Sequence, residues 1–152
     1  MTGTPQDLPL AGVTVVALEQ AVAGPLATRH LADLGARVIK LERPGEGDFA
    51  RHYDHAVRGL ATHFVWLNRG KQSLALDLKS EHGISTARAL IARADVFLHN
   101  TAPGVVERLG IDGETLRAAD PRLVVVNISG YGTSGPRRTS PCARSSRRRS
   151  TR

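Results

Sequence analysis

The stretch from Gly24 to Arg43 restricts the possible folds most, because it contains a complete helix followed at once by a strand. Pro25 suits the first helical position, where its missing N–H group would have no partner in any case. Gly35 suits the left-handed residue that ends a helix. The intervening residues predict one apolar helix face, which consists of Leu26, His30, Leu31 and Leu34.

The strand expected after this helix covers residues 37–42 and ends before Pro44, because proline cannot extend a central ladder. Other runs of β-branched and apolar residues predict strands at 12–19, 73–78, 95–99 and 122–128, with helices at 80–94, 103–109 and 112–118. Residues 49–70 have no consistent period, and we expect a surface excursion with one short helix. Strands that alternate with helices predict an α/β, Rossmann-like fold with a mostly parallel sheet and crossover helices.

The net charge of +7 resides in the carboxyl-terminal tail, residues 137–152. Seven of the 21 Lys and Arg residues lie there, and the rest of the chain has 14 basic and 14 acidic side chains. The tail has too few apolar residues to offset the entropy of ordering, so we expect disorder. It could bind polyanions nonspecifically, but it lacks the aromatic residues and docking element of a specific nucleic-acid site.

Several other classes of protein are disfavoured by composition. No apolar run approaches the ~20 residues of a membrane span. The amino terminus has no signal-peptide pattern, and a single cysteine, Cys142, fits a reducing compartment, so a cytoplasmic location is expected. The histidines show no metal-binding spacing, and no metal is expected. The glycine loop at 130–135 has dinucleotide-binding spacing, but no helix or acidic residue is expected after it.

Five polar residues near the ends of expected elements are candidates for a ligand site: Arg43, Lys71, Asn100, Arg108 and Tyr131. Loops at the carboxyl ends of parallel strands meet at one edge of the sheet. A basic, hydrogen-bonding rim at this edge would suit a phosphorylated ligand. Spacing alone is better explained by solvated surface side chains than by a ligand site.

The order of several motifs resembles CoA-transferase family III, the CaiB/BaiF type. These motifs are LAGVTVVALE, AGPLATRHLADLGARVIKLERPGEGD, NRGKQSLALDLKS, ADVFLHNTAPGVVERLGI and PRLVVVNISGYGTSGP, and they cover about residues 8–136. The family includes formyl-CoA and carnitine-CoA transferases, with α-methylacyl-CoA racemases as close relatives. Residues 8–136 would therefore be the amino-terminal part of a Rossmann-like CoA-binding domain.

The resemblance implies transfer of coenzyme A between an acyl-CoA and a carboxylic acid, with CoA as a substrate rather than a permanent cofactor, and interlocked homodimers in full-length members. By motif, Arg43, Lys71, Asn100 and Arg108 resemble CoA contacts, and Tyr131 would lie near the thioester. Val22 and Ser129 replace a glutamine and a lysine of the formyl-CoA enzymes, which argues against oxalate or formyl specificity.

The catalytic aspartate of the transferases is expected shortly after the glycine loop, but the last acidic residue of this chain is Asp120. A carboxylate there would attack the thioester and form a mixed anhydride. We therefore expect no catalytic residue in the chain, and interpret residues 137–152 as a frameshift product that leaves an inactive fragment. The alternatives are an acyl-CoA racemase or isomerase, and a noncatalytic protein that binds CoA or polyanions.

Overall fold

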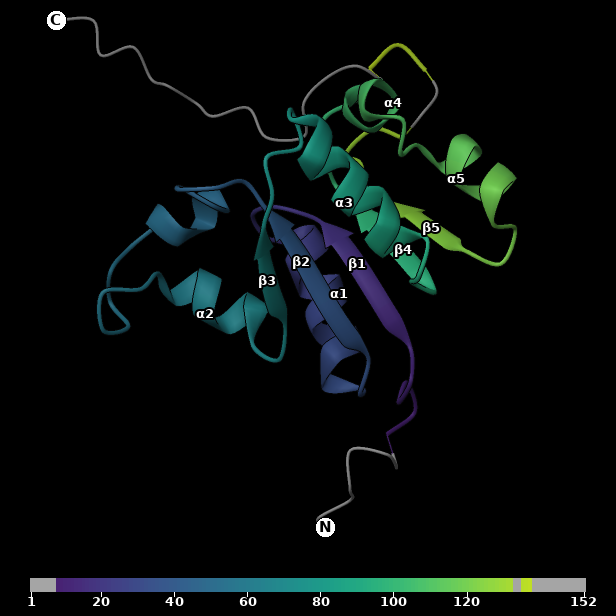
Figure 1. Ribbon diagram of the computed structural model, residues 1–152. Helices are drawn as coiled ribbons and strands as arrows, with labels where there is room; N and C mark the ends of the chain where they lie inside the picture. Colours follow the sequence, from purple (N-terminus) through teal and green to yellow (C-terminus); the bar gives the residue numbers. More distant parts are fainter. Residues whose placement is uncertain (1–7, 133–134, 138–152) are drawn as a thin grey trace, which may run out of the picture.

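Five parallel strands form the centre of the structure, a computed structural model that describes residues 8–132 and 135–137 (Figure 1). The strand order is β3-β2-β1-β4-β5, and helices cover both faces of the sheet. Along the chain the elements are β1 (Thr14–Leu18), α1 (Ala23–Asp33), β2 (Arg37–Glu42), the 3₁₀ helix η2 (Phe49–His52), α2 (Thr62–Asn68), β3 (Gln72–Ala75), α3 (Glu81–Ile91), β4 (Val96–His99), α4 (Val105–Leu109), α5 (Gly113–Ala119) and β5 (Val124–Asn127). The predicted parallel α/β fold is confirmed.

Side chains alternate between the two faces of the sheet along each strand, and the interior therefore consists of two apolar layers. In β1, Val15 and Ala17 belong to the layer beneath α1, whereas Val16 belongs to the layer beneath α3. β1 pairs with β2 in the register Val15↔Val38 and with β4 in the register Val16↔Phe97. Because every strand is parallel, the loops that follow β1, β2, β4 and β5 all leave the sheet at its carboxyl edge.

The buried face of α1 differs from the predicted one. Leu34 is 44% exposed and His30 is also exposed, so these two residues do not pack against the sheet. The helix begins at Ala23, two residues before the expected start, and its buried residues are Gly24, Pro25, Thr28 and Arg29. Small and polar side chains face the sheet here because α1 lies against a group of buried charges, described below.

The excursion between β2 and β3 contains two helices, η2 and α2, where we expected one. Their aromatic rings contact one another edge to face, with centroid separations of 5.8 Å for Phe49–Tyr53, 6.0 Å for Tyr53–His63 and 6.4 Å for His63–Trp66. The Tyr53–His63 contact joins the end of η2 to α2 across a loop, so no single period describes this segment. The structure does not describe residues 138–152, so the expectation of a disordered tail is untested.

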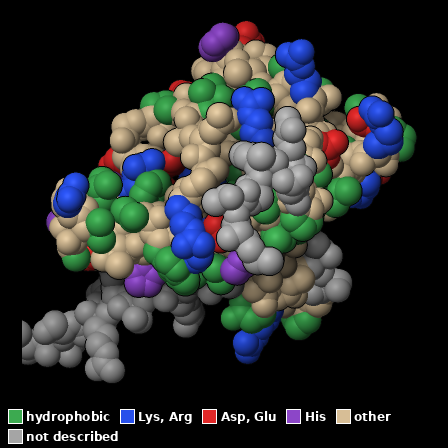
Figure 2. All heavy atoms as spheres, turned by 90° about the horizontal axis from the view of Figure 1, so that it is seen from below, with side chains coloured by type: hydrophobic (Ala, Val, Ile, Leu, Met, Phe, Trp, Pro, Cys, Tyr) green, Lys and Arg blue, Asp and Glu red, His purple; other side chains and the backbone are tan. Residues whose placement is uncertain are grey.

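No helix among the described residues has both the length and the apolar character required to cross a membrane. The face seen in Figure 2 shows Lys and Arg side chains scattered among apolar and uncharged ones, without a continuous basic patch on the described part of that face.

One glycine of α3 is required by close backbone packing. Ser80 caps this helix and accepts a hydrogen bond from the Gly83 N–H group at 3.0 Å, while a Cβ atom on Gly83 would collide with the Asp77 carbonyl group. We expect Gly83→Ala to destabilise the fold by about 1–3 kcal/mol, although alanine normally favours a helix.

Gly113→Ala is the matched control, because the new methyl group would lie 3.0 Å from the movable end of Arg117 and 3.3 Å from Val125 Cγ1, and would meet no backbone atom among these nearest neighbours. Urea unfolding should place this variant within about 0.5 kcal/mol of the unaltered protein. Equal effects of the two substitutions would contradict the packing argument.

Candidate functional site

The carboxyl edge of the sheet contains four of the five predicted site residues. Arg43 follows β2 and is exposed, although its guanidinium lies 3.4 Å from Glu46 and also donates to the Gly47 carbonyl oxygen. Arg108, on α4, is exposed, and Tyr131, in the loop after β5, is 47% exposed. These side chains are accessible to a ligand at the edge where open α/β sheets bind their ligands.

Asn100, the fourth of these residues, binds the backbone of a neighbouring loop. Its Oδ1 atom accepts a hydrogen bond from the Gln20 N–H group at 2.9 Å, and its Nδ2 group donates to the Gln20 carbonyl oxygen at 2.8 Å. Both polar atoms of the carboxamide are therefore used to join the loop after β4 to the loop after β1. A role for Asn100 as a direct CoA contact stays a prediction.

Lys71 occupies a different environment from the expected basic rim. It precedes β3 instead of following a strand, and its side chain is 2% exposed. Its Nζ group donates to Glu19 Oε1 at 2.8 Å, to the Pro25 carbonyl oxygen at 2.8 Å and to Asn68 Oδ1 at 3.2 Å. An ammonium group has three donors, so any contact with CoA would have to replace one of these bonds.

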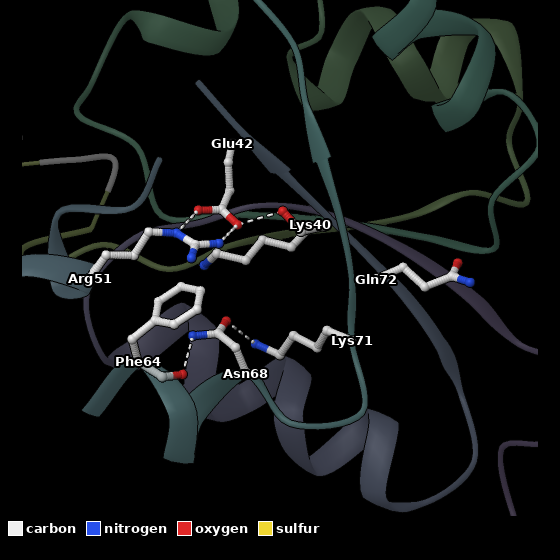
Figure 3. A pocket seen from close by; sticks show the side chains of 8 residues that line it. Lys40, Glu42, Arg51, Phe64, Asn68, Lys71 and Gln72 are labelled. Carbon is white, nitrogen blue, oxygen red and sulfur yellow. Dashed lines mark hydrogen bonds and ion pairs between the residues drawn. The ribbon is translucent and has the colours of Figure 1, made fainter. Parts of the chain in front are cut away.

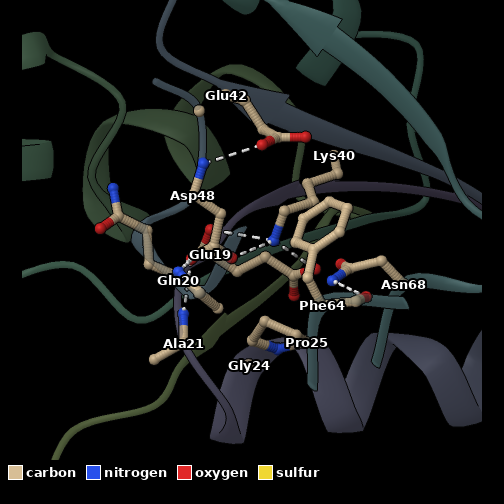
Figure 4. Close-up of polar contacts among 12 residues, drawn as sticks. Glu19, Gln20, Ala21, Gly24, Pro25, Lys40, Glu42, Asp48, Phe64 and Asn68 are labelled. Carbon is tan, nitrogen blue, oxygen red and sulfur yellow. Dashed lines mark hydrogen bonds and ion pairs between the residues drawn. The ribbon is translucent and has the colours of Figure 1, made fainter. Parts of the chain in front are cut away.

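The Lys71 ammonium is part of a buried ion network at the ends of β1 and β2, which consists of Glu19, Lys40, Asp48 and Lys71. Figure 4 shows the first three of these residues. Lys40 Nζ lies 2.9 Å from Asp48 and 3.6 Å from Glu19, and these three side chains are at most 1% exposed. The Thr28 hydroxyl also lies 2.8 Å and 2.9 Å from the two carboxylate oxygens of Glu19. The two carboxylates and two ammonium groups balance in charge, as buried ions must.

Burial lowers the pKa of Lys71, and the adjacent Glu19 carboxylate opposes that effect. The ion pair with Glu19 therefore offsets part of the cost of burying the ammonium group. Charged groups held in this way fix the geometry of the loops that carry them.

A third buried carboxylate, Glu42, lies at the end of β2 beside this network. It accepts two hydrogen bonds from Arg51, each 2.8 Å long, one from the Ser73 hydroxyl at 2.6 Å and one from the Asp48 N–H group at 2.8 Å. Burial raises the pKa of Glu42, but these hydrogen bonds together lower it from 4.5 to about 2. Glu42 is consequently an anion at every physiological pH.

A small pocket of about 110 Å³ opens between these groups and α2 (Figure 3). Its walls include Lys40, Glu42 and Lys71, and the Arg51 guanidinium lies 3.8 Å from the centre of the Phe64 ring. Each charged group in the wall already has a partner of opposite charge, so the pocket offers little free charge to an anion. Within residues 8–132 and 135–137, no group of three or more His, Cys, Asp or Glu residues could hold a metal ion.

Five residues of this region were not predicted from the sequence: Glu19, Lys40, Glu42, Asp48 and Arg51. A usable signal was present, because Lys40 lies within a strand of the expected parallel sheet, and crossover helices cover both faces of such a sheet. A charged residue in such a strand requires a partner of opposite sign nearby. Glu19 is the last residue of the strand expected at 12–19, and Asp48 lies in the loop after the strand expected at 37–42, so both could have been proposed as its partners.

Comparison with known proteins gives a consistent result. A family model described as CoA-transferase family III matches residues 10–144. Over 141 residues the chain is 40% identical to succinyl-CoA:glutarate CoA-transferase of Mus musculus, covering 89% of this chain and 32% of that protein. Over 128 residues it is 41% identical to acetyl-CoA:oxalate CoA-transferase of Acetobacter aceti, covering 84% of this chain and 33% of that protein.

Solved structures agree with these matches. A CaiB/BaiF family protein from Brucella suis superposes with a TM-score of 0.82 at 39% identity, covering 90% of this chain and 37% of that one. The protein Rv3272 of Mycobacterium tuberculosis gives a TM-score of 0.81 at 41% identity, covering 88% and 38%. The chain thus spans about one third of the length of the relatives it matches.

Proposed function

The chain belongs to CoA-transferase family III, and we propose that it is the CoA-binding part of an enzyme that transfers coenzyme A between an acyl-CoA and a carboxylic acid. The two relatives described above are named for transfer between acyl-CoA and dicarboxylic acids, which favours transfer over racemisation. In the proposed enzyme CoA is a substrate that enters and leaves. We also propose that the full-length protein forms an interlocked homodimer.

The observation that carries the proposal is the group of exposed polar side chains at the carboxyl edge of the sheet. Arg43 and Arg108 supply fixed positive charges there, and Tyr131 supplies a hydroxyl group. CoA is a polyanion with several phosphate groups, and guanidinium groups bind phosphate oxygens in pairs of charge-assisted hydrogen bonds. A parallel sheet with this edge open is the usual platform for such a ligand.

We further propose that residues 137–152 lie outside the CoA-binding domain, which would leave the chain without the aspartate nucleophile of the transferases. The absence of any acidic residue after Asp120 supports this part of the proposal. The intact mass of the protein in its native cell tests it. A mass well above 16.3 kDa would show that the native protein continues in another reading frame.

Substitution of the edge arginines should weaken CoA binding. We expect Arg43→Ala and Arg108→Ala each to reduce CoA affinity about tenfold or more in isothermal titration calorimetry, because each removes a charge-assisted hydrogen bond to phosphate. Arg93→Ala is the matched control, since this exposed arginine precedes β4 at the opposite edge of the sheet. Equal losses in all three variants would contradict a site at the carboxyl edge.

A salt series separates this proposal from nonspecific binding of polyanions by the basic tail. Binding carried by clustered arginines weakens steeply as salt rises, whereas CoA held partly by hydrogen bonds and apolar contacts should lose much less affinity. A steep loss that Arg43→Ala leaves unchanged would favour the tail.

A further inference from the structure

The turn after β1, residues 20–22, has a backbone conformation that alanine rarely adopts. Ala21 has a φ angle of +63°, in the left-handed region where a Cβ atom crowds the backbone. Among the described residues only one other non-glycine residue, Arg58, has a positive φ angle. Such conformations persist where surrounding contacts enforce them, and they cluster at functional sites.

Two side chains from distant parts of the sequence enforce the conformation of this turn (Figure 4). Asp48 Oδ1 accepts a hydrogen bond from the Ala21 N–H group at 3.1 Å, and Asn100 forms the two bonds to the Gln20 backbone described above. Asp48 is itself held by the Lys40 ammonium and by its own N–H bond to Glu42. The turn is therefore fixed on one side by the loop after β2 and on the other by the loop after β4.

The residues on either side of this turn are packed closely against the start of α1. A Cβ atom on Gly24, in the first turn of that helix, would lie 3.0 Å from Glu19 Cβ and 3.1 Å from Asn100 Cγ. Gln20, by contrast, is exposed. The clamped backbone thus carries an accessible polar side chain between two packed loops.

The turn lies where the strand order of the sheet reverses, with β2 and β3 on one side of β1 and β4 and β5 on the other. β1 and β4 are neighbours, but α1 covers one face of the sheet while α3 covers the other. In open α/β sheets, the crevice between the loops of two such strands receives the ligand. Asn100 joins the two loops that border this crevice.

We propose that Asp48 and Asn100 are positioning residues that hold residues 20–22 in a strained, ready-made conformation for CoA binding. The ligand in this inference rests on the proposed function. A turn that is already fixed loses little backbone entropy when the ligand binds. The strain at Ala21 destabilises the free protein, and the clamp keeps the turn in the binding conformation.

Ala21→Gly distinguishes this role from a merely structural one. Glycine accepts the left-handed conformation without strain, so the melting temperature should be unchanged or higher. CoA affinity should nevertheless fall about tenfold, because a glycine turn must be ordered on binding. The control is Arg58→Gly, which makes the same change in the excursion before α2 and should leave CoA affinity unchanged. An Ala21→Gly variant that binds CoA as well as the unaltered chain would overturn the proposal.

Hydrogen exchange at the Gln20 and Ala21 amides tests the clamp without any ligand. Both amides should be protected, with Gln20 exchanging faster in Asn100→Ala and Ala21 exchanging faster in Asp48→Ala. Unchanged exchange rates would overturn the clamp. If the unaltered chain bound no CoA, the proposed function and the ligand named here would both fail, while these rates would still decide whether the clamp exists.

Discussion

Lys40→Ala is expected to destabilise the folded chain by about 3–5 kcal/mol, the range typical of removing one partner from a buried ion pair. Lys40 is 1% exposed and lies between the carboxylates of Glu19 and Asp48. Without its ammonium group, these carboxylates would retain only the positive charge of Lys71 and would lie buried close to each other. Urea unfolding with an unchanged m-value should report the loss directly.

Two further variants test whether the lost charge, and not the lost side-chain volume, causes the fall in stability of Lys40→Ala. Lys40→Met preserves most of the side-chain volume and should lose nearly as much stability as Lys40→Ala. Lys79→Ala removes an exposed lysine and should change stability by less than about 0.5 kcal/mol. A loss below about 1 kcal/mol for Lys40→Met would show that the buried network contributes little.

A double-mutant cycle measures the pair itself. Combining Lys40→Met with Asp48→Asn should cost less than the sum of the two single changes, because each single variant leaves the other charge unpaired. Strict additivity would mean that the 2.9 Å contact between the two residues has no energetic coupling.

The positions of the strands along the chain, and their parallel arrangement, could be predicted from the sequence because the residues that indicate a strand are close together in the chain. The strand at 37–42 was predicted with its exact bounds, since a glycine helix end precedes it and Arg43-Pro44 follows it. The other strands begin and end within three residues of their predicted bounds. Apolar runs of this length, punctuated by Gly, Pro and Asn, identify parallel strands without tertiary information.

The interior face of α1 could not be predicted in the same way, because it depends on partners distant in sequence. Thr28 is buried since its hydroxyl contacts Glu19, and Lys71 reaches the Pro25 carbonyl oxygen from a segment 46 positions away. A pattern search that seeks only apolar residues selects Leu34, which is exposed. Polar packing of this kind becomes visible only when the charges on different strands are matched with one another.

The sequence predicts that the candidate residues lie near strand ends, and their role in binding CoA stays a prediction. Strand ends give the edge at which Arg43 and Arg108 lie, but not the fate of each side chain. Lys71 was expected at an accessible rim and is buried, because Glu19 and Asn68 compete successfully with solvent for its ammonium group. The clamp on Ala21 depends on a backbone angle, which residue type alone does not indicate when the residue is not glycine.

Stability should also fall as the solution becomes acidic, and Glu42 should account for a measurable part of the loss. The pKa of this carboxyl group is about 2 in the folded chain and 4.5 in an unperturbed environment. Because the folded-state pKa is lowered, the stabilisation is fully present above pH 4.5 and disappears as the pH falls toward 2. The total is about 3 kcal/mol, of which about 2 kcal/mol is lost by pH 3.

Urea unfolding of the unaltered chain and of Glu42→Gln at pH 7 and pH 3 measures this contribution. The unaltered chain should lose about 2 kcal/mol more than Glu42→Gln between these two values, because the glutamine cannot titrate. Glu46→Gln is the control, since Glu46 lies in the same loop with 75% of its side chain exposed and should follow the unaltered profile. Parallel pH profiles for the unaltered chain and Glu42→Gln would mean that the bonds from Arg51, Ser73 and the Asp48 backbone do not stabilise the ionised carboxylate.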